Sequence, residues 1–531
     1  MVSKRLRELC ARAVFITYSQ FIKFKKHIMK SIVLFFALLI SFSNTYSQAF
    51  PFPQHTQYKG TYIKPNYTQQ QLDNDVTTFY NSWKTKYLIN GCETNQYYIY
   101  FDDGNTNTVS EAMGYGFMII PLMAGYDINA KTYFDGLYRY YKAHPSHIMA
   151  RLMAWKQITN CIDSDGPDSA TDGDIDIAFG LLLAHAQWGS AGSINYFLEA
   201  KLMIQDIMGA NRSQGDINQD YYSVKLGDWV TSGSTMKATR TSDFIMDHFR
   251  LFASAVSDTS WNNVVDECYA LVDSMQTNYS QQTGLLPDFI VDINTNPKPA
   301  DPDFLEGALD GDYSYNACRD PWRMTSDYLT SGDVRGRNAT LKIAKWLHDT
   351  TSQNINKVYA GYYLDGSRAA NWNDNSFTAP FTVGAMLDTA HQAWLNTLYN
   401  GIKGFYSNGG YYDNTLTLLS LITISGNYWV PDTSLMNGIF SSERSQIDIF
   451  NLETNLVQNK LILNFNNKRH ISDYRLKILD MVGNTVWAGE NNNYTSLDID
   501  TSFLRNGMYI IYGMDTKNSQ IVESEKFIIA K

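Results

Sequence analysis

Residues 175–188, IDIAFGLLLAHAQW, decide the fold that we predict for this chain, because a helix over them is apolar on nearly every side. Residues 114–126, GYGFMIIPLMAGY, have the same character. A helix of this kind is stable only when it is buried all round. The two stretches therefore predict helices at the centre of a large domain.

Amphipathic stretches alternate with these buried ones between about residues 68 and 425. They place apolar residues at i, i+3, i+4 and i+7, which is typical of a helix with one buried face. These stretches are residues 68–88, 129–144, 193–209, 241–256, 261–279 and 336–351. Two kinds of helix in alternation predict an all-α domain with an inner and an outer ring.

The pattern changes to period two after residues 428–446. Short alternating runs such as KLILNF (460–465) and GMYIIYGM (507–514), separated by turn residues, predict strands of a small β-sandwich. We therefore expect a helical domain over 48–430, a linker over 431–445 and a β-sandwich over 446–531.

The first 47 residues have the features of an export signal. A basic stretch precedes an apolar run from Ser31 to Ile40, and small or polar residues follow up to Ser47. Translation from Met29 would retain all of these features, and cleavage is expected near Ser47 and Gln48. The alternative is a membrane anchor, but the run is too short to span a bilayer.

Charge and cysteine content narrow the range of functions. The leader holds eight basic residues and one acidic residue, so the remaining chain has 35 basic and 52 acidic residues and a net charge of −17. Nucleic acid is therefore not an expected partner, whereas a cationic ligand would be favoured. Cys92, Cys161, Cys268 and Cys318 form no CxxC pair, so we predict no zinc site, and their pairing is left open.

Acidic residues stand next to both buried stretches. Glu111 lies in TVSEAMGYG (108–116), and Asp172, Asp174 and Asp176 alternate at the start of the second buried helix. A calcium loop would require a different ligand spacing. Helix capping explains one aspartate but hardly three. The third interpretation is paired carboxylates for the hydrolysis of glycosides.

The two motifs resemble those of glycoside hydrolase family 8. ATDGDIDIAFGLLLAHAQW (170–188) is similar to the family signature, and TVSEAMGYG is similar to the stretch around its proton donor. Ala112, Met113 and Gly180 depart from the usual residues. The resemblance extends over about residues 55–430. It implies an (α/α)6 barrel that hydrolyses a β-1,4-linked polysaccharide with inversion, without a metal or cofactor, and with Glu111 as the general acid.

The resemblance leaves the general base less certain. In one branch of the family the base is an aspartate in a stretch similar to YSYNACRDPWR (313–323), where this chain has Asn316. The branch that includes chitosanases has asparagine there and uses a glutamate slightly upstream. We therefore predict Glu306 as the base, and Asp303, Asp310 and Asp312 are the alternatives.

Other residues are expected to bind the substrate. The resemblance implies that Asp172 distorts the sugar ring at the cleavage point. Arg319 would orient Asn316 or a carboxylate, or form a purely structural ion pair. Because sugar C–H faces stack on aromatic rings, each tryptophan below is a candidate, although a place in the core is the commoner one for such a residue. The full set of expected binding residues is Tyr115, Trp155, Trp229, Arg240, Asp243, Tyr315, Asn316, Arg319 and Trp322.

The C-terminal strands resemble the sorting domain of the type IX secretion system of Bacteroidetes. NGMYII (506–511) and the terminal Lys531 match that pattern. A carbohydrate-binding module is the alternative, but the expected strands lack an aromatic strip. The chain is thus expected to engage the type IX machinery and to be secreted or attached to the cell surface.

The sequence therefore predicts a secreted, monomeric, endo-acting β-1,4-glycanase, with chitosan as the favoured substrate because of the Asn316 branch and the negative charge. The alternative substrate is cellulose or mixed-linkage β-glucan. A glycan-binding surface protein that lacks catalysis is the alternative outside the enzymes, and Asn316 is the residue that raises it.

Overall fold

The computed structural model describes residues 48–209 and 214–437, and the following parts of the C-terminal region: 450–452, 456–465, 474–480, 485–490, 496–515 and 521–531. The predicted leader lies outside the described residues. In the described part of the chain, no helix is long and apolar enough to cross a membrane.

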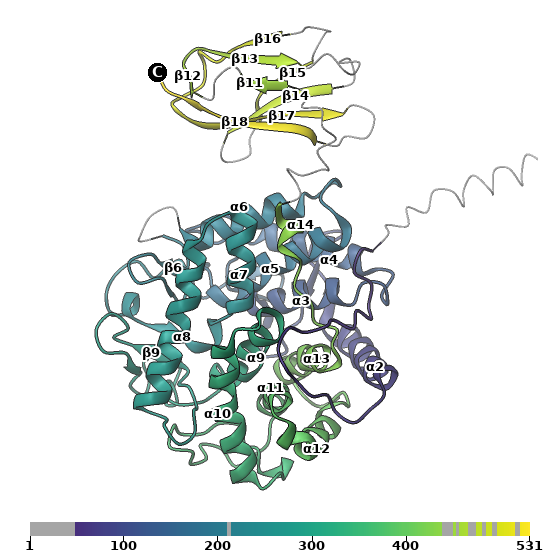
Figure 1. Ribbon diagram of the computed structural model, residues 1–531, viewed down its shortest axis with the longest axis vertical. Helices are drawn as coiled ribbons and strands as arrows, with labels where there is room; N and C mark the ends of the chain where they lie inside the picture. The colour runs from purple at the N-terminus through teal and green to yellow at the C-terminus, as the bar shows by residue number, and fades with distance from the viewer. Residues whose placement is uncertain are drawn as a thin grey trace, which may run out of the picture. The chain divides into compact units, whose positions relative to one another are not determined.

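Helices α2 to α13 form two concentric rings, which Figure 1 shows in a view along their common axis. The outer ring consists of α2 (Gln69–Tyr87), α4 (Ala130–Ala143), α6 (Tyr196–Met208), α8 (Ser260–Asn278), α10 (Val334–Thr351) and α12 (Gln392–Ile402). The inner ring consists of α3 (Ser110–Leu122), α5 (Thr171–Trp188), α7 (Met246–Val256), α9 (Asp320–Ser331), α11 (Asn375–Gly384) and α13 (Tyr411–Ser425). Inner and outer helices alternate along the chain, as an (α/α)6 barrel requires.

Burial distinguishes the two rings. Nearly every residue of α3, α5 and α13 is buried, whereas α2 buries one face that includes Leu72, Val76 and Trp83. The prediction of two helical layers is therefore confirmed. Residues 241–256 differ in detail: they were expected to form one amphipathic helix, but residues 241–243 form a 3-10 turn before α7, and α7 lies in the inner ring.

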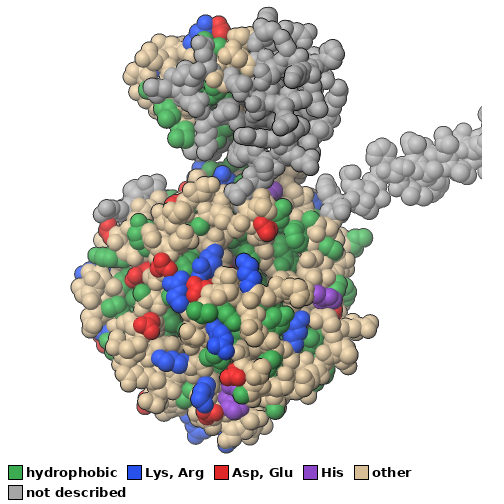
Figure 2. Space-filling view, in the orientation of Figure 1, with side chains coloured by type: hydrophobic (Ala, Val, Ile, Leu, Met, Phe, Trp, Pro, Cys, Tyr) green, Lys and Arg blue, Asp and Glu red, His purple; other side chains and the backbone are tan. Residues whose placement is uncertain are grey.

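An extended N-terminal segment crosses one end of the barrel. The backbone N–H groups of Phe52, Thr56, Lys59 and Ile63 donate to the carbonyls of Ala124, Gly426, Leu329 and Met386, respectively. These carbonyls lie at or just after the C-terminal ends of inner helices, where backbone acceptors lack partners within the helix. The segment thus covers the C-terminal end of the barrel. This end faces the viewer in Figure 2, where side chains of both charges are scattered among uncharged ones.

Short strands lie in the loops that precede the inner helices. The strands β3 (Thr106–Val109), β4 (Lys156–Ile158) and β5 (Ile162–Asp163) form an antiparallel sheet that leads directly into α3. The strands β8 (Thr239–Arg240), β9 (Phe289–Val291) and β10 (Lys298–Pro299) form another such sheet next to α7. The hairpins β1–β2 (Leu88–Asn90, Tyr97–Ile99) and β6–β7 (Ile217–Asn218, Ser223–Val224) complete this layer.

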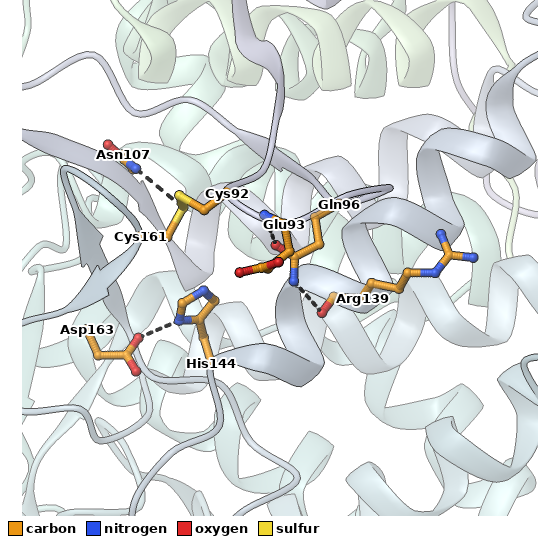
Figure 3. Close-up of a disulfide and its surroundings, with 8 residues drawn as sticks. All are labelled: Cys92, Glu93, Gln96, Asn107, Arg139, His144, Cys161 and Asp163. Atoms are coloured by element: carbon orange, nitrogen blue, oxygen red, sulfur yellow. Dashed lines mark hydrogen bonds and ion pairs between the residues drawn. A yellow bond between two sulfur atoms is a disulfide. The ribbon is translucent and has the colours of Figure 1, made fainter.

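A disulfide joins Cys92 to Cys161, which answers the question of pairing (Figure 3). It connects the β1–β2 turn to the turn between β4 and β5, and the Asn107 amide donates to Cys161 Sγ. His144 forms a hydrogen bond with Asp163 on the same sheet at 2.8 Å. Cys268 and Cys318 are free and buried. The disulfide therefore ties together the loops that lead into α3 and α5.

The C-terminal region forms two β-sheets. One contains β11 (Phe450–Leu452), β13 (Lys460–Phe465) and β16 (Ser496–Asp500), and the other has the order β12-β18-β17-β14-β15. The second sheet comprises Leu456–Val457, Ile521–Ile529, Gly507–Asp515, Tyr474–Asp480 and Thr485–Glu490. A separate apolar core, which includes Leu463, Ile478 and Ile511, lies in this domain. The prediction of a β-sandwich is therefore confirmed. The short helix α14 (Thr433–Asn437) lies within the expected linker.

Candidate active site

The N-terminal end of the barrel, opposite the covered end, gathers the polar residues that the sequence singled out. Inner helices begin at this end, and each brings polar side chains in its first turn or just before it. These are Glu111 of α3, Asp172 of α5, Asp243 before α7, Arg319 before α9, Asp374 before α11 and Tyr411 of α13. Free N–H groups at helix N-termini favour carboxylates, which accounts for the acidic character of this end.

Glycines allow α3 and α5 to approach closely, and so bring Glu111 and Asp172 together. A Cβ atom on Gly173 would lie 2.5 Å from the Ser110 side chain, and one on Gly114 would lie 2.7 Å from Asp176 Cβ. A Cβ atom on Gly180 would lie 2.5 Å from Phe117 Cβ. The Gly180 departure from the family pattern therefore concerns packing between α3 and α5 in the core.

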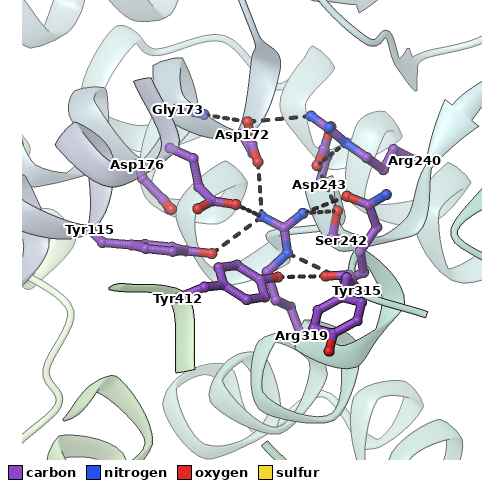
Figure 4. Close-up of polar contacts among 12 residues, drawn as sticks. Tyr115, Asp172, Gly173, Asp176, Arg240, Ser242, Asp243, Tyr315, Arg319 and Tyr412 are labelled. Atoms are coloured by element: carbon purple, nitrogen blue, oxygen red, sulfur yellow. Dashed lines mark hydrogen bonds and ion pairs between the residues drawn. The ribbon is translucent and has the colours of Figure 1, made fainter. Parts of the chain in front are cut away.

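Arg319 is the centre of a hydrogen-bond network that includes both carboxylates (Figure 4). Its Nη1 donates to Glu111 Oε2 at 2.9 Å and to Asp172 Oδ2 at 2.8 Å. Its Nη2 donates to Ser242 Oγ at 2.8 Å and to Asn316 Oδ1 at 3.0 Å. Arg319 is 1% exposed, so this guanidinium is a fixed part of the site rather than a surface charge.

The two carboxylates that share Arg319 have opposite pKa shifts. Burial raises the pKa of Glu111 to about 7, although Arg319 acts to lower it. Burial also acts to raise the pKa of Asp172, but Arg240 and Arg319 together lower it to about 2. Arg240 Nη2 lies 3.3 Å from Asp172 Oδ1. At neutral pH, Glu111 can thus carry a proton while Asp172 is ionised.

The other two aspartates of the α5 motif, Asp174 and Asp176, stabilise the fold. Asp176 forms a bidentate ion pair with Arg323 at 3.1 and 2.6 Å, and both are buried. Asp174 Oδ1 accepts from the Met153 backbone N–H at 2.9 Å, which fixes the loop before α5. The three alternating aspartates thus point to different partners. Among the residues that the structure describes, no cluster of three potential ligands could hold a metal ion.

Arg240 and Asp243 lie where the sequence placed them, beside Asp172. Arg240 Nε donates to both carboxylate oxygens of Asp243 at 3.1 Å. Its Nη1 lies 3.5 Å from Glu306 Oε1. Arg240 therefore bridges Asp172 and Glu306, the expected distorting residue and the expected base.

Asn316 holds the Glu306 carboxylate. Because Arg319 only donates hydrogen bonds, the Asn316 oxygen must face Arg319, and the Asn316 amide nitrogen then faces Glu306. That nitrogen donates to Glu306 Oε2 at 2.8 Å. The Glu306 side chain is 47% exposed, so a water molecule can reach the carboxylate. The asparagine that raised doubt about catalysis thus positions a carboxylate.

The alternative base residues lie in other surroundings. Asp310 is buried and accepts from the backbone N–H groups of Leu305, Glu306 and Gly307 at 2.6, 2.9 and 2.9 Å. Asp312 Oδ1 accepts from Leu364 N–H at 3.0 Å. Asp303 is exposed at a turn with φ of 59°. Asp310 thus supports the loop that carries Glu306.

The expected aromatic residues divide into two groups. Trp155, Trp229 and Tyr315 are partly exposed before α5, α7 and α9. Tyr115 and Trp322 are buried. The Tyr115 hydroxyl lies 3.2 Å from Arg319 Nη1, so it supports the network, whereas Trp322 donates to Thr423 and packs in the core. Trp322 therefore cannot stack on a sugar, and its prediction as a binding residue is corrected.

Besides Asp374, sequence reasoning missed four further residues of the site. The Tyr411 hydroxyl donates to Glu111 Oε1 at 3.1 Å, and the Tyr412 hydroxyl donates to the Tyr315 carbonyl at 2.6 Å. Ser242 accepts from Arg319. Asp288 is buried, accepts from Ala317 N–H at 2.7 Å, and has a pKa that burial raises to about 7. The two tyrosines open α13, which is buried on nearly every side, but its polar residues hide the all-apolar pattern that marked Glu111 and Asp172.

One family model and two relatives match most of this chain. Residues 32–426 match the model of glycosyl hydrolases family 8. The chain is 47% identical over 380 residues to a β-glucanase of Niallia circulans, covering 71% of this chain and 91% of that protein. It is 38% identical over 392 residues to an endoglucanase of Bacillus sp. strain KSM-330, covering 72% of this chain and 82% of that protein.

A solved structure that is similar to this chain is also that of a glucanase. The apo structure of a β-1,3-1,4-glucanase from Paenibacillus sp. X4 aligns with a TM-score of 0.70 and 47% identity, covering 72% of this chain and all of that one. Residues 455–530 match the secretion system C-terminal sorting domain, which confirms the sorting domain over a carbohydrate-binding module. The sorting domain indicates export, to the exterior or to the cell surface.

Proposed function

Since this chain belongs to family 8 of the glycosyl hydrolases and is a glycoside hydrolase, we propose that it is an endo-acting β-glucanase that cleaves β-1,4 bonds in cellulose or mixed-linkage β-glucan with inversion. The observation that carries the substrate class is the 47% identity to a β-glucanase over 91% of that relative. The geometry of the site supports this reaction.

Glu111 is the proposed general acid. An acid for this reaction must hold its proton until the leaving oxygen needs it, and a pKa near 7 meets that requirement. Burial supplies the shift, while Arg319 and Tyr411 orient the two carboxyl oxygens. Glu111 would protonate the glycosidic oxygen as the bond to the anomeric carbon breaks.

Glu306 is the proposed general base. Its Oε2 accepts from Asn316, and its exposed side chain can accept a proton from a water molecule. In an inverting enzyme that water attacks the anomeric carbon from the face opposite the leaving group. Asp310 holds the backbone of this loop in place through three hydrogen bonds.

Asp172 is the proposed residue that holds the distorted sugar. It is ionised, nearly buried and fixed by Arg319 and Arg240, so it can accept a hydrogen bond from a sugar hydroxyl without taking up the proton. A hydrogen bond from a hydroxyl to a carboxylate is stronger than one between neutral groups. Trp155, Trp229 and Tyr315 are the proposed stacking surfaces.

The comparisons do not support chitosan, the substrate that the sequence favoured, because the similar proteins are named as glucanases. We therefore adopt the alternative substrate class. The test is reducing-sugar release from barley β-glucan, carboxymethylcellulose and chitosan in parallel. Release from either glucan is expected, and release from chitosan alone would refute the proposal.

The remaining proposals concern the whole chain. We propose that residues 1–47 contain a signal peptide that starts the export route on which the sorting domain acts. We also propose that the enzyme is monomeric. Size-exclusion chromatography with light scattering would show a single-chain mass if this is so.

A further inference from the structure

The loop before α11 holds a tryptophan rigidly in solvent. The Trp372 carbonyl accepts from Ala360 N–H at 3.0 Å, and the Asn373 amide donates to the Val358 carbonyl at 2.6 Å. Asp374 then caps α11 by accepting from Ser376 N–H at 2.9 Å. The chain is therefore held at Trp372 and at the two residues that follow it, yet the Trp372 side chain is 55% exposed. Packing within the barrel does not explain this exposure.

Trp372 lies next to the proposed site through Tyr315. The Tyr315 hydroxyl donates to Asp374 Oδ2 at 3.1 Å and also interacts with the Trp372 side chain. Tyr315 is itself 40% exposed, and its ring packs edge-on against Phe377 of α11 with centroids 5.0 Å apart. The next residue, Asn316, binds Glu306. Tyr315 thus connects Trp372 and Asp374 with Asn316, the residue that holds the proposed base.

The position in the ring separates Trp372 from the other aromatic candidates. Trp155 and Trp229 precede α5 and α7, whereas Trp372 precedes α11, on the other side of the inner ring (Figure 1). Asp172 opens α5 itself, while Glu111 opens α3 and Arg319 precedes α9, and α3 and α9 lie between the two sides. A polysaccharide that meets Trp155 or Trp229 and passes the carboxylates would reach Trp372 next.

The chemistry of this flank matches a neutral sugar. An indole face binds the C–H face of a pyranose, and carboxylates accept hydrogen bonds from its hydroxyls. Asp374 supplies such an acceptor next to the rings. We propose that Trp372, Tyr315 and Asp374 form an additional subsite that binds a glucosyl unit of the polysaccharide away from the cleaved bond. This inference rests on the proposed glucanase function.

The test compares the full chain with Trp372→Ala, Trp372→Phe and Tyr126→Ala. Tyr126 is a matched control, because it is 44% exposed and lies after α3 at the covered end. Migration through gels containing barley β-glucan measures binding without catalysis, and steady-state kinetics on the same glucan measures KM and kcat. Trp372→Ala should weaken binding and raise KM about three- to tenfold, with kcat within about twofold. Trp372→Phe should restore most of the binding, and Tyr126→Ala should behave as wild type.

The outcomes separate this inference from the proposed function. Unchanged migration and KM in Trp372→Ala, with glucan still hydrolysed, would overturn the subsite and leave the glucanase intact. A fall in kcat together with the melting temperature would reveal a structural role and would also overturn it. A wild-type chain that neither binds nor cleaves β-glucan would overturn both.

Discussion

A single guanidinium holds two carboxylates in different protonation states. Arg319 contacts both Glu111 and Asp172, but of these two carboxylates only Asp172 also lies within ion-pair distance of Arg240. Arg240 and Arg319 together outweigh the effect of burial on the pKa of Asp172, while burial dominates at Glu111. An acid and an anion therefore lie side by side, as a glycosidase needs when it must give a proton and hold a sugar at the same point.

Replacement of Glu111 by glutamine tests the proposed acid. Glu111→Gln keeps the shape and can still accept from Arg319, but it cannot protonate the leaving group. We expect kcat on barley β-glucan to fall on the order of 10²–10⁴-fold with KM little changed. If Glu111→Gln keeps most of its activity and has the melting temperature of the wild type, Glu111 is only a structural carboxylate.

The raised pKa of Glu111 predicts the alkaline limit of activity. The acid must be protonated in the free enzyme, so it is competent below its pKa of about 7 and loses the proton as the pH rises through that value. The value of kcat/KM should therefore decline above about pH 7. The residual activity of Glu111→Gln should lack this decline, and an unchanged alkaline limb in that variant would assign it to another group.

Residue types and local pattern predicted only part of the site. Glu111 and Asp172 could be found because each opens a helix that is apolar all round. Their shared contact with Arg319, more than a hundred positions away, depends on the close approach of α3 and α5 and on the start of α9. Asp288 and Trp372 lie in loops without such a pattern. Trp322 is a tryptophan like the others in sequence, and only packing distinguishes it as core.

At the scale of elements, the loop over residues 303–312 carries the proposed base. Asp310 accepts hydrogen bonds from three backbone N–H groups at and beside Glu306 and thereby fixes the conformation of the loop. Asp310→Asn presents an amide N–H to the same donors and should release Glu306 from its position. We expect kcat to fall about ten- to a hundredfold with KM nearly unchanged, because small displacements of a catalytic group are costly.

The matched control for that prediction is Asp301→Asn, an exposed aspartate just before this loop, which should retain full activity. Equal activity of Asp310→Asn and wild type would show that catalysis does not depend on the loop geometry that Asp310 maintains.

Element type was predictable where periodicity was strong. The six amphipathic stretches correspond to helices, and KLILNF and GMYIIYGM lie in β13 and β17. The ring to which a helix belongs was less predictable: α7 is an inner helix although its pattern is amphipathic, because neighbouring helices and loops cover its polar side chains. Asp247, for example, is buried and accepts from the Tyr428 hydroxyl at 2.6 Å.

At the scale of the molecule, the barrel and the β-sandwich have separate cores. We propose that residues 48–437 contain everything that hydrolysis requires. A chain truncated after residue 437 should therefore keep kcat/KM on β-glucan within about twofold, since the site residues lie in the barrel. Its export in a host with the matching secretion system should be lost. Loss of hydrolysis in a folded truncated barrel would contradict this division.

At the scale of the molecule, net charge does not identify the substrate of this chain. A net charge of −17 favoured a cationic polysaccharide, but net charge speaks mainly to solubility and long-range attraction. Substrate choice depends on the groups within the site. There, buried arginines neutralise most of the carboxylates, and the exposed groups include aromatic rings that suit an uncharged glucan.

The most direct test of the central claim is proton NMR of the reducing ends released from barley β-glucan during the first minutes of hydrolysis. Direct attack of a water activated by Glu306, with Glu111 as the acid, inverts the anomeric carbon. We expect the α-anomer to appear first and to convert to the equilibrium mixture only by mutarotation. Initial release of the β-anomer would contradict the inverting acid–base pair, and release of no reducing ends would contradict the glucanase itself.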